Sequence, residues 1–141
     1  MNPRVAPAGH PSDGTTQQNA ALIRRLAEAW NRHDLEAFLE CFDPGYESEQ
    51  PLHPELSFRG RESVRERWSA NFAAMPDFRA DLLALAVDGD LAWTEWHWHG
   101  TRSDGSRRDE RGVIVYRIRG DRIASGRLYM SPGPDDSSRS P

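Results

Sequence analysis

The sequence lacks lysine entirely, contains one cysteine and has no long apolar run. The single cysteine, Cys41, excludes an intrachain disulfide framework and any zinc site that needs several cysteines. The longest apolar run covers residues 82–87, whereas a helix needs about 20 apolar residues to span a bilayer. The first residues, MNPRVAPAGHPSDG, carry no apolar signal-peptide core. Together these absences predict a soluble, reduced, cytoplasmic protein.

Concentrated positive charge is absent as well. The chain carries 18 basic residues, all of them arginine, and 22 acidic residues, so its formal net charge is −4. Proteins that bind nucleic acid or anionic membranes present a dense basic patch, and these arginines are scattered along the whole chain. We therefore expect neither nucleic acid nor a membrane among the partners, and we interpret the missing lysine as a coding bias.

The length of 141 residues fits one domain, and a domain of this size buries about 68–70% of the surface of its unfolded chain. Both ends are rich in Pro, Gly, Ser and Asp, and they contain too few apolar residues to offset the entropy lost on ordering. We therefore predict disordered tails at residues 1–14 and 132–141 and one folded domain at residues 15–131.

The first half of the chain spaces its apolar residues as helices do. A capping box at Thr15 opens the first predicted helix, and Asp34 is a good N-cap for the second. The second and third predicted helices cover residues 35–42 and 61–75, and a short extended stretch lies between them at residues 46–50.

From Phe78 onward the apolar pattern changes to the period of two that is typical of strands. The predicted strands cover residues 78–87, 91–100, 112–119 and 122–130. Residues 101–111 are predicted to form a polar connection. Helices followed by hairpin-linked strands predict an α+β fold, with three N-terminal helices packed on a curved, mainly antiparallel sheet.

Five segments resemble one known superfamily. They are AWNRHDLEAFLECFDP at 29–44, FRGRESVRERW at 58–68, MPDFRADL at 75–82, WTEWHWHGT at 93–101 and GDRIASGRLYM at 120–130. The chain resembles the nuclear transport factor 2-like superfamily, in its SnoaL-like or polyketide cyclase-like branch. This resemblance implies a cone-shaped α+β fold, a homodimer, and a deep pocket between the helices and the concave face of the sheet. It also implies a range of activities, from isomerases, cyclases, dehydratases and epoxide hydrolases to non-catalytic binding modules.

The catalytic positions of two relatives are replaced in this chain. The tyrosine, the base and the second acid of the steroid isomerases fall on Leu26, Gln50 and Ile114. The acid–base aspartate of the polyketide cyclase falls on Ser131, which cannot hold a transferable proton near neutral pH. The resemblance therefore argues against this chain catalysing either the steroid isomerase reaction or the polyketide cyclase reaction with those residues.

The segment WTEWHWH at 93–99 puts Thr94, Trp96 and Trp98 on one face of a strand and three polar residues on the other. The resemblance directs the tryptophans into the pocket, where they either form an aromatic wall for a flat ligand or fill the core. The opposite face carries Glu95, His97 and His99 in a spacing that metal sites use. Because the tryptophans occupy the inner face, we expect these three at a dimer interface or in solvent, with no metal and no cofactor bound.

The loop at 49–54 is expected near the mouth of the pocket. Histidine titrates near pH 6.5, which suits proton transfer, although a histidine between prolines is often only exposed. We therefore name His53 and Glu49 as candidate catalytic residues. The expected ligand-binding residues are Trp30, Gln50, Trp68, Phe72, Trp96, Trp98, Tyr116 and Met130. The expected pocket is aromatic, largely uncharged and gated by the His53 loop, and Cys41 is interpreted as a small buried side chain.

Two functions remain open on this basis. One is a cofactor-independent lyase, isomerase or cyclase that applies acid–base chemistry to a small apolar or aromatic substrate. The other is a non-catalytic, dimeric module that binds such a molecule or a partner. In both cases we expect a homodimer through the outer face of the sheet. The residues expected there are Glu95, His97, Val113, Val115, Arg127 and Tyr129.

Overall fold

The computed structural model describes residues 12–132, and the predicted tails lie outside the described residues except at their inner ends. The three helices are α1 (Ser12–Asn31), α2 (Leu35–Glu40) and α3 (Arg61–Ala74), and a 3-10 turn, η3, covers Pro54–Leu56. Helix α1 begins three residues before the predicted capping box, inside the predicted tail. The Asp34 side chain accepts a hydrogen bond from the Ala37 amide and caps α2 as predicted.

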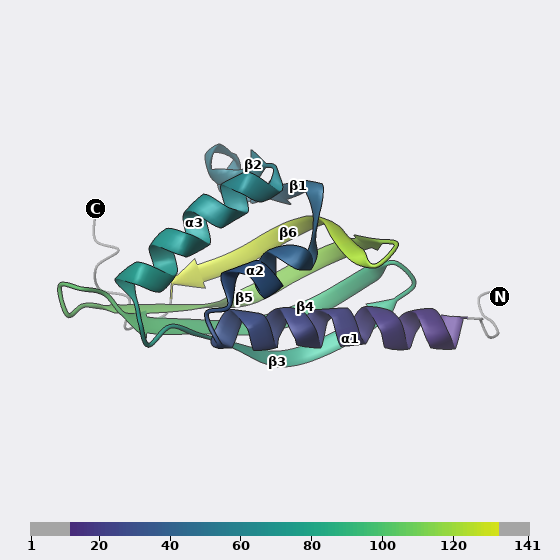
Figure 1. The fold of residues 1–141 in the computed structure, drawn as a ribbon, viewed down its shortest axis with the longest axis horizontal. Helices are drawn as coiled ribbons and strands as arrows, with labels where there is room; N and C mark the ends of the chain where they lie inside the picture. The colour runs from purple at the N-terminus through teal and green to yellow at the C-terminus, as the bar shows by residue number, and fades with distance from the viewer. Residues whose placement is uncertain (1–11, 133–141) are drawn as a thin grey trace.

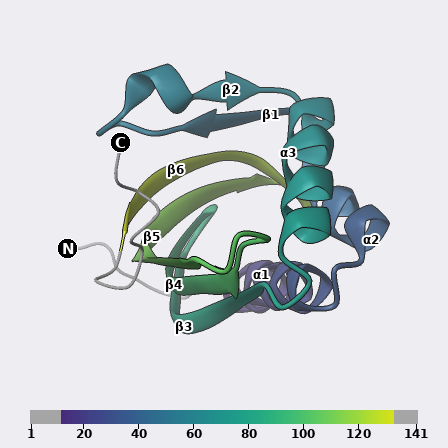
Figure 2. The same cartoon turned by 90° about the vertical axis from the view of Figure 1, so that its left-hand side faces the viewer.

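Six strands form one mixed sheet: β1 (Phe42–Glu49), β2 (Phe58–Arg59), β3 (Arg79–Asp88), β4 (Leu91–Thr101), β5 (Arg107–Arg119) and β6 (Arg122–Pro132). Their order in the sheet is β2-β1-β6-β5-β4-β3. Only the β1–β6 pair is parallel within this sheet, so the prediction of a mainly antiparallel α+β fold is confirmed. Figure 2 shows the strands curving around the space that α3 and α1 face.

Two predicted boundaries are wrong for reasons of strand pairing. Phe42 was assigned to the second helix, but it pairs with Ile123 and opens β1. The predicted polar connection at 101–111 contains only a short turn, because β5 begins at Arg107 opposite Thr101. Strand β2 and the 3-10 turn were not predicted, since elements of two or three residues leave no periodic signal.

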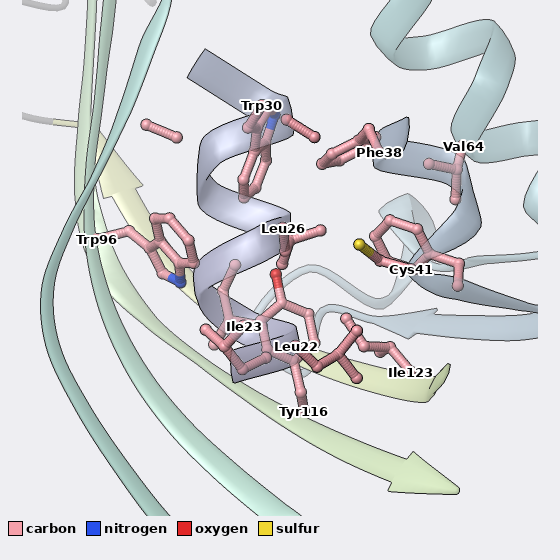
Figure 3. Close-up of a cluster of buried hydrophobic side chains, with 14 of the residues drawn as sticks. Leu22, Ile23, Leu26, Trp30, Phe38, Cys41, Val64, Trp96, Tyr116 and Ile123 are labelled. Atoms are coloured by element: carbon pink, nitrogen blue, oxygen red, sulfur yellow. The ribbon is translucent and has the colours of Figure 1, made fainter. Parts of the chain in front are cut away.

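Helix α1 runs along the sheet beside β3 and β4 (Figure 1), and the core lies between this helix and the concave face, where Figure 3 shows buried side chains. Leu22, Ile23 and Leu26 of α1 are fully buried there. The Asn31 side chain at the end of α1 accepts a hydrogen bond from the Ala80 amide and donates one to the Ala80 carbonyl, at 2.7 and 3.0 Å. These two bonds fix the end of the helix against β3. No helix among the described residues is long and apolar enough to cross a bilayer.

Candidate functional site

A cavity with two connected parts opens between α3, the first strand and the inner face of the central strands. The inner chamber has a volume of about 240 Å³ and is mostly aromatic. The outer chamber, of about 730 Å³, carries more polar side chains. The two chambers share lining from Gln50, Asn71, Trp98, Arg108 and Leu128. Aromatic side chains with a few convergent polar groups are typical of small-molecule sites.

Strand β4 alternates as the sequence predicts, but its two inner tryptophans lie in different environments. Trp96 is completely buried, and its Nε1 donates to Thr94 Oγ1 at 2.6 Å. It packs against Trp30 with ring centroids 5.0 Å apart and lines neither chamber. Trp98 lines both chambers. Of the two predicted alternatives, Trp96 therefore fills the core and Trp98 forms part of the cavity wall.

Two indole N–H groups in the inner chamber have no protein partner. Trp30 Nε1 and Trp98 Nε1 are buried, and neither forms a hydrogen bond within the described part of the chain. Both residues line the inner chamber, with ring centroids 5.2 Å apart. A buried donor without an acceptor costs about 1–3 kcal/mol, so each group would gain free energy if a small movement of its ring brought it to an acceptor.

An ion pair lies at the junction of the chambers. Arg108 Nε and Nη2 donate to the two carboxylate oxygens of Glu110, at 2.9 and 3.4 Å. Arg108 Nη1 also donates to Asn71 Oδ1 at 3.2 Å, and its guanidinium carbon lies 5.5 Å from the centroid of the Trp98 ring. The expectation of an uncharged pocket is therefore wrong, because this pair forms part of its wall.

Two tyrosines line the inner chamber. Tyr46 and Tyr116 are buried there, and burial raises the pKa of both phenols, in Tyr46 against the opposing effect of a hydrogen bond with Ser48. Both hydroxyl groups therefore stay protonated at neutral pH and are available as donors. Space is tight beside them, since a Cβ on Gly126 would lie 2.7 Å from the Tyr46 hydroxyl.

The other predicted site residues lie in different environments. His53 lines the outer chamber as an exposed side chain, with Nδ1 3.8 Å from the Glu55 carboxylate. Glu49 is exposed and lines neither chamber. Phe72 stacks on His33 instead of facing the cavity. The remaining predicted residues line at least one chamber: Trp30, Gln50, Trp68, Tyr116 and Met130.

Sequence reasoning missed the charged part of the site. Arg108 and Glu110 lie in a segment that was interpreted as a loop, RRDER at 107–111. A signal was present, because residues 108, 110, 112, 114 and 116 have the same parity and so share the inner face of one strand. Asn71 and Tyr46 carried no comparable signal.

A second polar group, the outer-face cluster, lies on the opposite side of the sheet. It consists of Asp81, His97, His99 and Asp109. His97 Nε2 donates to Asp109 Oδ1 at 2.7 Å, and His99 Nε2 donates to Asp81 Oδ2 at 2.8 Å. Glu95, which the sequence grouped with the histidines, is exposed and has no part in these bonds.

These features define an α+β domain of the nuclear transport factor 2-like class, with its cavity on the concave face of the sheet. The model of the SnoaL-like domain family matches residues 23–126, so the chain belongs to the SnoaL-like domain family. No functionally curated protein matches the chain.

Solved structures support the same fold. Bal32a, from a soil-derived mobile gene cassette, is similar with 24% identity and a TM-score of 0.71 over 82% of this chain and 90% of its own. IdmH of Streptomyces antibioticus, a proposed polyketide cyclase, is 25% identical with a TM-score of 0.70 over 81% of this chain and 92% of its own. A proposed SnoaL-like polyketide cyclase from Jannaschia is 18% identical with a TM-score of 0.73 over 87% of this chain and 92% of its own.

Proposed function

We propose that this protein binds a small, largely apolar or aromatic carbonyl compound across the inner and outer chambers and catalyses a proton transfer on it, as a lyase, isomerase or cyclase. The observation that carries the proposal is the pair of unpartnered indole N–H groups of Trp30 and Trp98. Trp98 and Arg108 line both chambers, whereas Trp30 lines the inner chamber and Glu110 lines the outer one. A carbonyl oxygen satisfies the donors, and the aromatic side chains cover the rest of the ligand.

The proposed chemistry uses Glu110 as the base. Its carboxylate removes a proton from the carbon next to the carbonyl, and the electron pair moves to the carbonyl oxygen to give an enolate. Arg108 and the indole N–H groups donate to this oxygen, which stabilises the developing negative charge. If the substrate carries a double bond next to the reacting carbon, the enolate is a dienolate, and return of the proton at its far carbon completes an isomerisation. If a leaving group sits on the carbon beyond the reacting one, it departs with its bonding electrons as a carbon–carbon double bond forms, and Glu110 passes the proton to solvent. His53 at the outer chamber is the proposed route for the proton to solvent, and Glu49 has no role.

The second candidate function is a binding module without catalysis. The observation that favours it is the replacement of the steroid isomerase positions by Leu26, Gln50 and Ile114. In addition, Arg108 is already engaged by Glu110 and Asn71, which leaves it fewer free donors for a ligand. The two functions differ in whether a bound ketone exchanges its protons.

Binding is tested first, by calorimetric titration of the full chain with β-naphthol and with naphthalene. We expect β-naphthol to bind more tightly, because its hydroxyl oxygen can accept from the indole donors. Trp98→Ala should weaken binding by at least about tenfold, or 1.4 kcal/mol. Trp93→Ala is the matched control, since Trp93 lies exposed on the outer face of the same strand. Equal loss of affinity in both variants contradicts the proposed cavity.

Catalysis is tested with tetralone, a bicyclic aryl ketone, in deuterated water. We expect the protein to accelerate exchange of the protons next to the carbonyl, as followed by NMR. Glu110→Gln should reduce this acceleration by at least about 100-fold, which is at the lower end of what a general base contributes. His53→Ala should slow exchange less. Tight binding of tetralone with no exchange in the wild type supports the binding module instead.

We also propose that two copies associate through the outer face of the sheet. Trp93 and Tyr129 are 48% and 37% exposed there, beside the valines of β5. Exposed aromatic groups next to apolar neighbours are typical of an interface. Sedimentation at micromolar concentration should give a dimer for the wild type and a monomer for Trp93→Arg. Leu52→Arg is the matched control at an exposed leucine outside this face. A wild type that sediments as the 16.0 kDa chain contradicts the proposal.

A further inference from the structure

We infer that the outer-face cluster is a binding site for a divalent transition metal, with zinc as the expected ion. In the register of the sheet, Asp81 of β3 lies directly opposite His97 of β4. His99 follows two residues later and therefore lies on the same face. The sequence predicted no metal chiefly because the tryptophans occupy the inner face of the strand, and it offered only Glu95 as a nearby third ligand. Strand pairing supplies aspartates that are distant in the sequence.

The distances between the ligand atoms suit one ion. One ligand atom each from Asp81, His97 and His99 lies within 4.8 Å of the other two. Zinc bonds to nitrogen and oxygen are about 2.0–2.2 Å long, so the ligand atoms around a tetrahedral ion lie about 3.3–3.5 Å apart. Asp109 Oδ1, 2.7 Å from His97 Nε2, is close enough to become the fourth ligand after a small rotation of the ring. The ion would take the place of the Nε2 protons between each imidazole and its carboxylate, and each neutral ring would then carry its proton on Nδ1.

The charge of the cluster also suits a dication. Two carboxylates and two neutral imidazoles carry a formal charge of −2. Asp109 is only 7% exposed, and a buried carboxylate is costly unless a positive partner compensates it. The competing cation is Arg79, whose Nε lies 3.3 Å from Asp81 Oδ1 but whose side chain is largely exposed.

The backbone holds this ligand set in place. The ligands come from three neighbouring strands, β3, β4 and β5, which pair continuously at the ligand positions, with one register shift between Leu82 and Ala84. The two imidazole rings lie with centroids 4.5 Å apart, and each is oriented by its own carboxylate. Sites built on strands are more rigid than sites on loops. Because the cluster faces away from the cavity, the ion would clamp the strands and have no part in the chemistry of the pocket.

The test is a zinc titration of the full chain after treatment with a chelator, in competition with a chromophoric zinc indicator. We expect one zinc per chain, since all ligands come from one chain. His97→Ala and His99→Ala should each weaken zinc binding by at least about tenfold, and the isosteric Asp81→Asn should also weaken it. His53→Ala is the matched control, because it removes an exposed imidazole elsewhere and should bind zinc as the wild type does.

A second measurement separates a metal site from a hydrogen-bond network. Cobalt bound to the wild type should show the visible absorption bands of a four-coordinate ion, and His99→Ala should lose them. Zinc should raise the thermal unfolding midpoint of the wild type and of His53→Ala, but not that of Asp81→Asn. The inference is overturned if zinc titrates the indicator as though no protein were present. It is equally overturned if the cluster variants bind zinc like the wild type.

Discussion

The two faces of β4 carry similar residues in very different surroundings. On the concave face, Trp96 and Trp98 are 0% and 5% exposed, whereas Trp93 on the convex face is 48% exposed. On the concave face an ion pair lines a cavity, and on the convex face two imidazole–carboxylate pairs lie side by side. The difference shows that residue type alone does not define a site. Whether a tryptophan or a charged side chain lines a cavity, fills the core or meets solvent depends on the face of the sheet that it occupies and on the neighbouring strands.

The concave face should dominate stability, and its tryptophans give the largest expected effect. Trp96→Ala should lower the free energy of unfolding by about 3–5 kcal/mol, because it leaves a cavity among fully packed rings. Trp93→Ala is the matched control on the same strand and should cost less than about 1 kcal/mol. Urea denaturation followed by circular dichroism, at one protein concentration, measures both. Similar losses in the two variants would remove the distinction between the faces.

The ion pair of the cavity gives the next largest effect. Arg108→Met should destabilise the fold by about 2–3 kcal/mol, because it leaves the Glu110 carboxylate mostly buried and unpaired. The double variant Arg108→Met, Glu110→Met should lose less than the sum of the two single variants.

An exposed ion pair provides the control for this cycle. Arg117 Nη1 lies 2.8 Å from Asp90 Oδ2, and both side chains are more than half exposed. A double-mutant cycle on this pair should give a coupling of about 0–1 kcal/mol. If the coupling of the cavity pair is no larger, the interior of the cavity is as well solvated as the surface.

Much of the fold follows from patterns that the sequence displays. Helical spacing located α1 and α3, and the period of two from Phe78 located the four long hairpin-linked strands. Alternation placed Trp96 and Trp98 on one face of the strand, and the family resemblance directed that face inward, where both side chains are buried. The capping role of Asp34 was equally local.

The charged part of the site could not be found in this way. Arg108 and Glu110 come from a segment whose polarity is typical of a loop, and it becomes a strand only because β4 pairs with it. Asp81 and Asp109 reach the histidines by strand register, which a single sequence does not specify across long separations. Trp96 and Trp98 have the same pattern, and Trp30 packs against both rings. Only the structure shows that Trp96 donates to Thr94 in the core while Trp98 lines the cavity.

The smallest expected effect concerns the buried phenols of the inner chamber. Burial raises the pKa of Tyr46 and Tyr116 above the ordinary value near 10. Above pH 10 the unfolded chain therefore releases protons that the folded chain keeps, and stability should fall as the pH rises. Each tyrosine contributes about 1.4 kcal/mol per pH unit to this slope. Burial also raises the pKa of the Cys41 thiol, to about 11, so the thiol adds to the slope between pH 9 and 11.

Urea denaturation at a series of pH values from 9 to 11.5 measures the slope, and phenylalanine variants assign it. Tyr46→Phe and Tyr116→Phe should each make the alkaline loss of stability shallower, because each removes one phenol that keeps its proton in the folded chain and releases it in the unfolded chain. Tyr129→Phe is the matched control, since it removes a partly exposed phenol from the convex face. A slope that Tyr129→Phe changes as much as Tyr46→Phe would mean that water reaches the inner chamber as freely as the outer surface. The indole donors there would then be hydrated, and the argument that they await a ligand would fail.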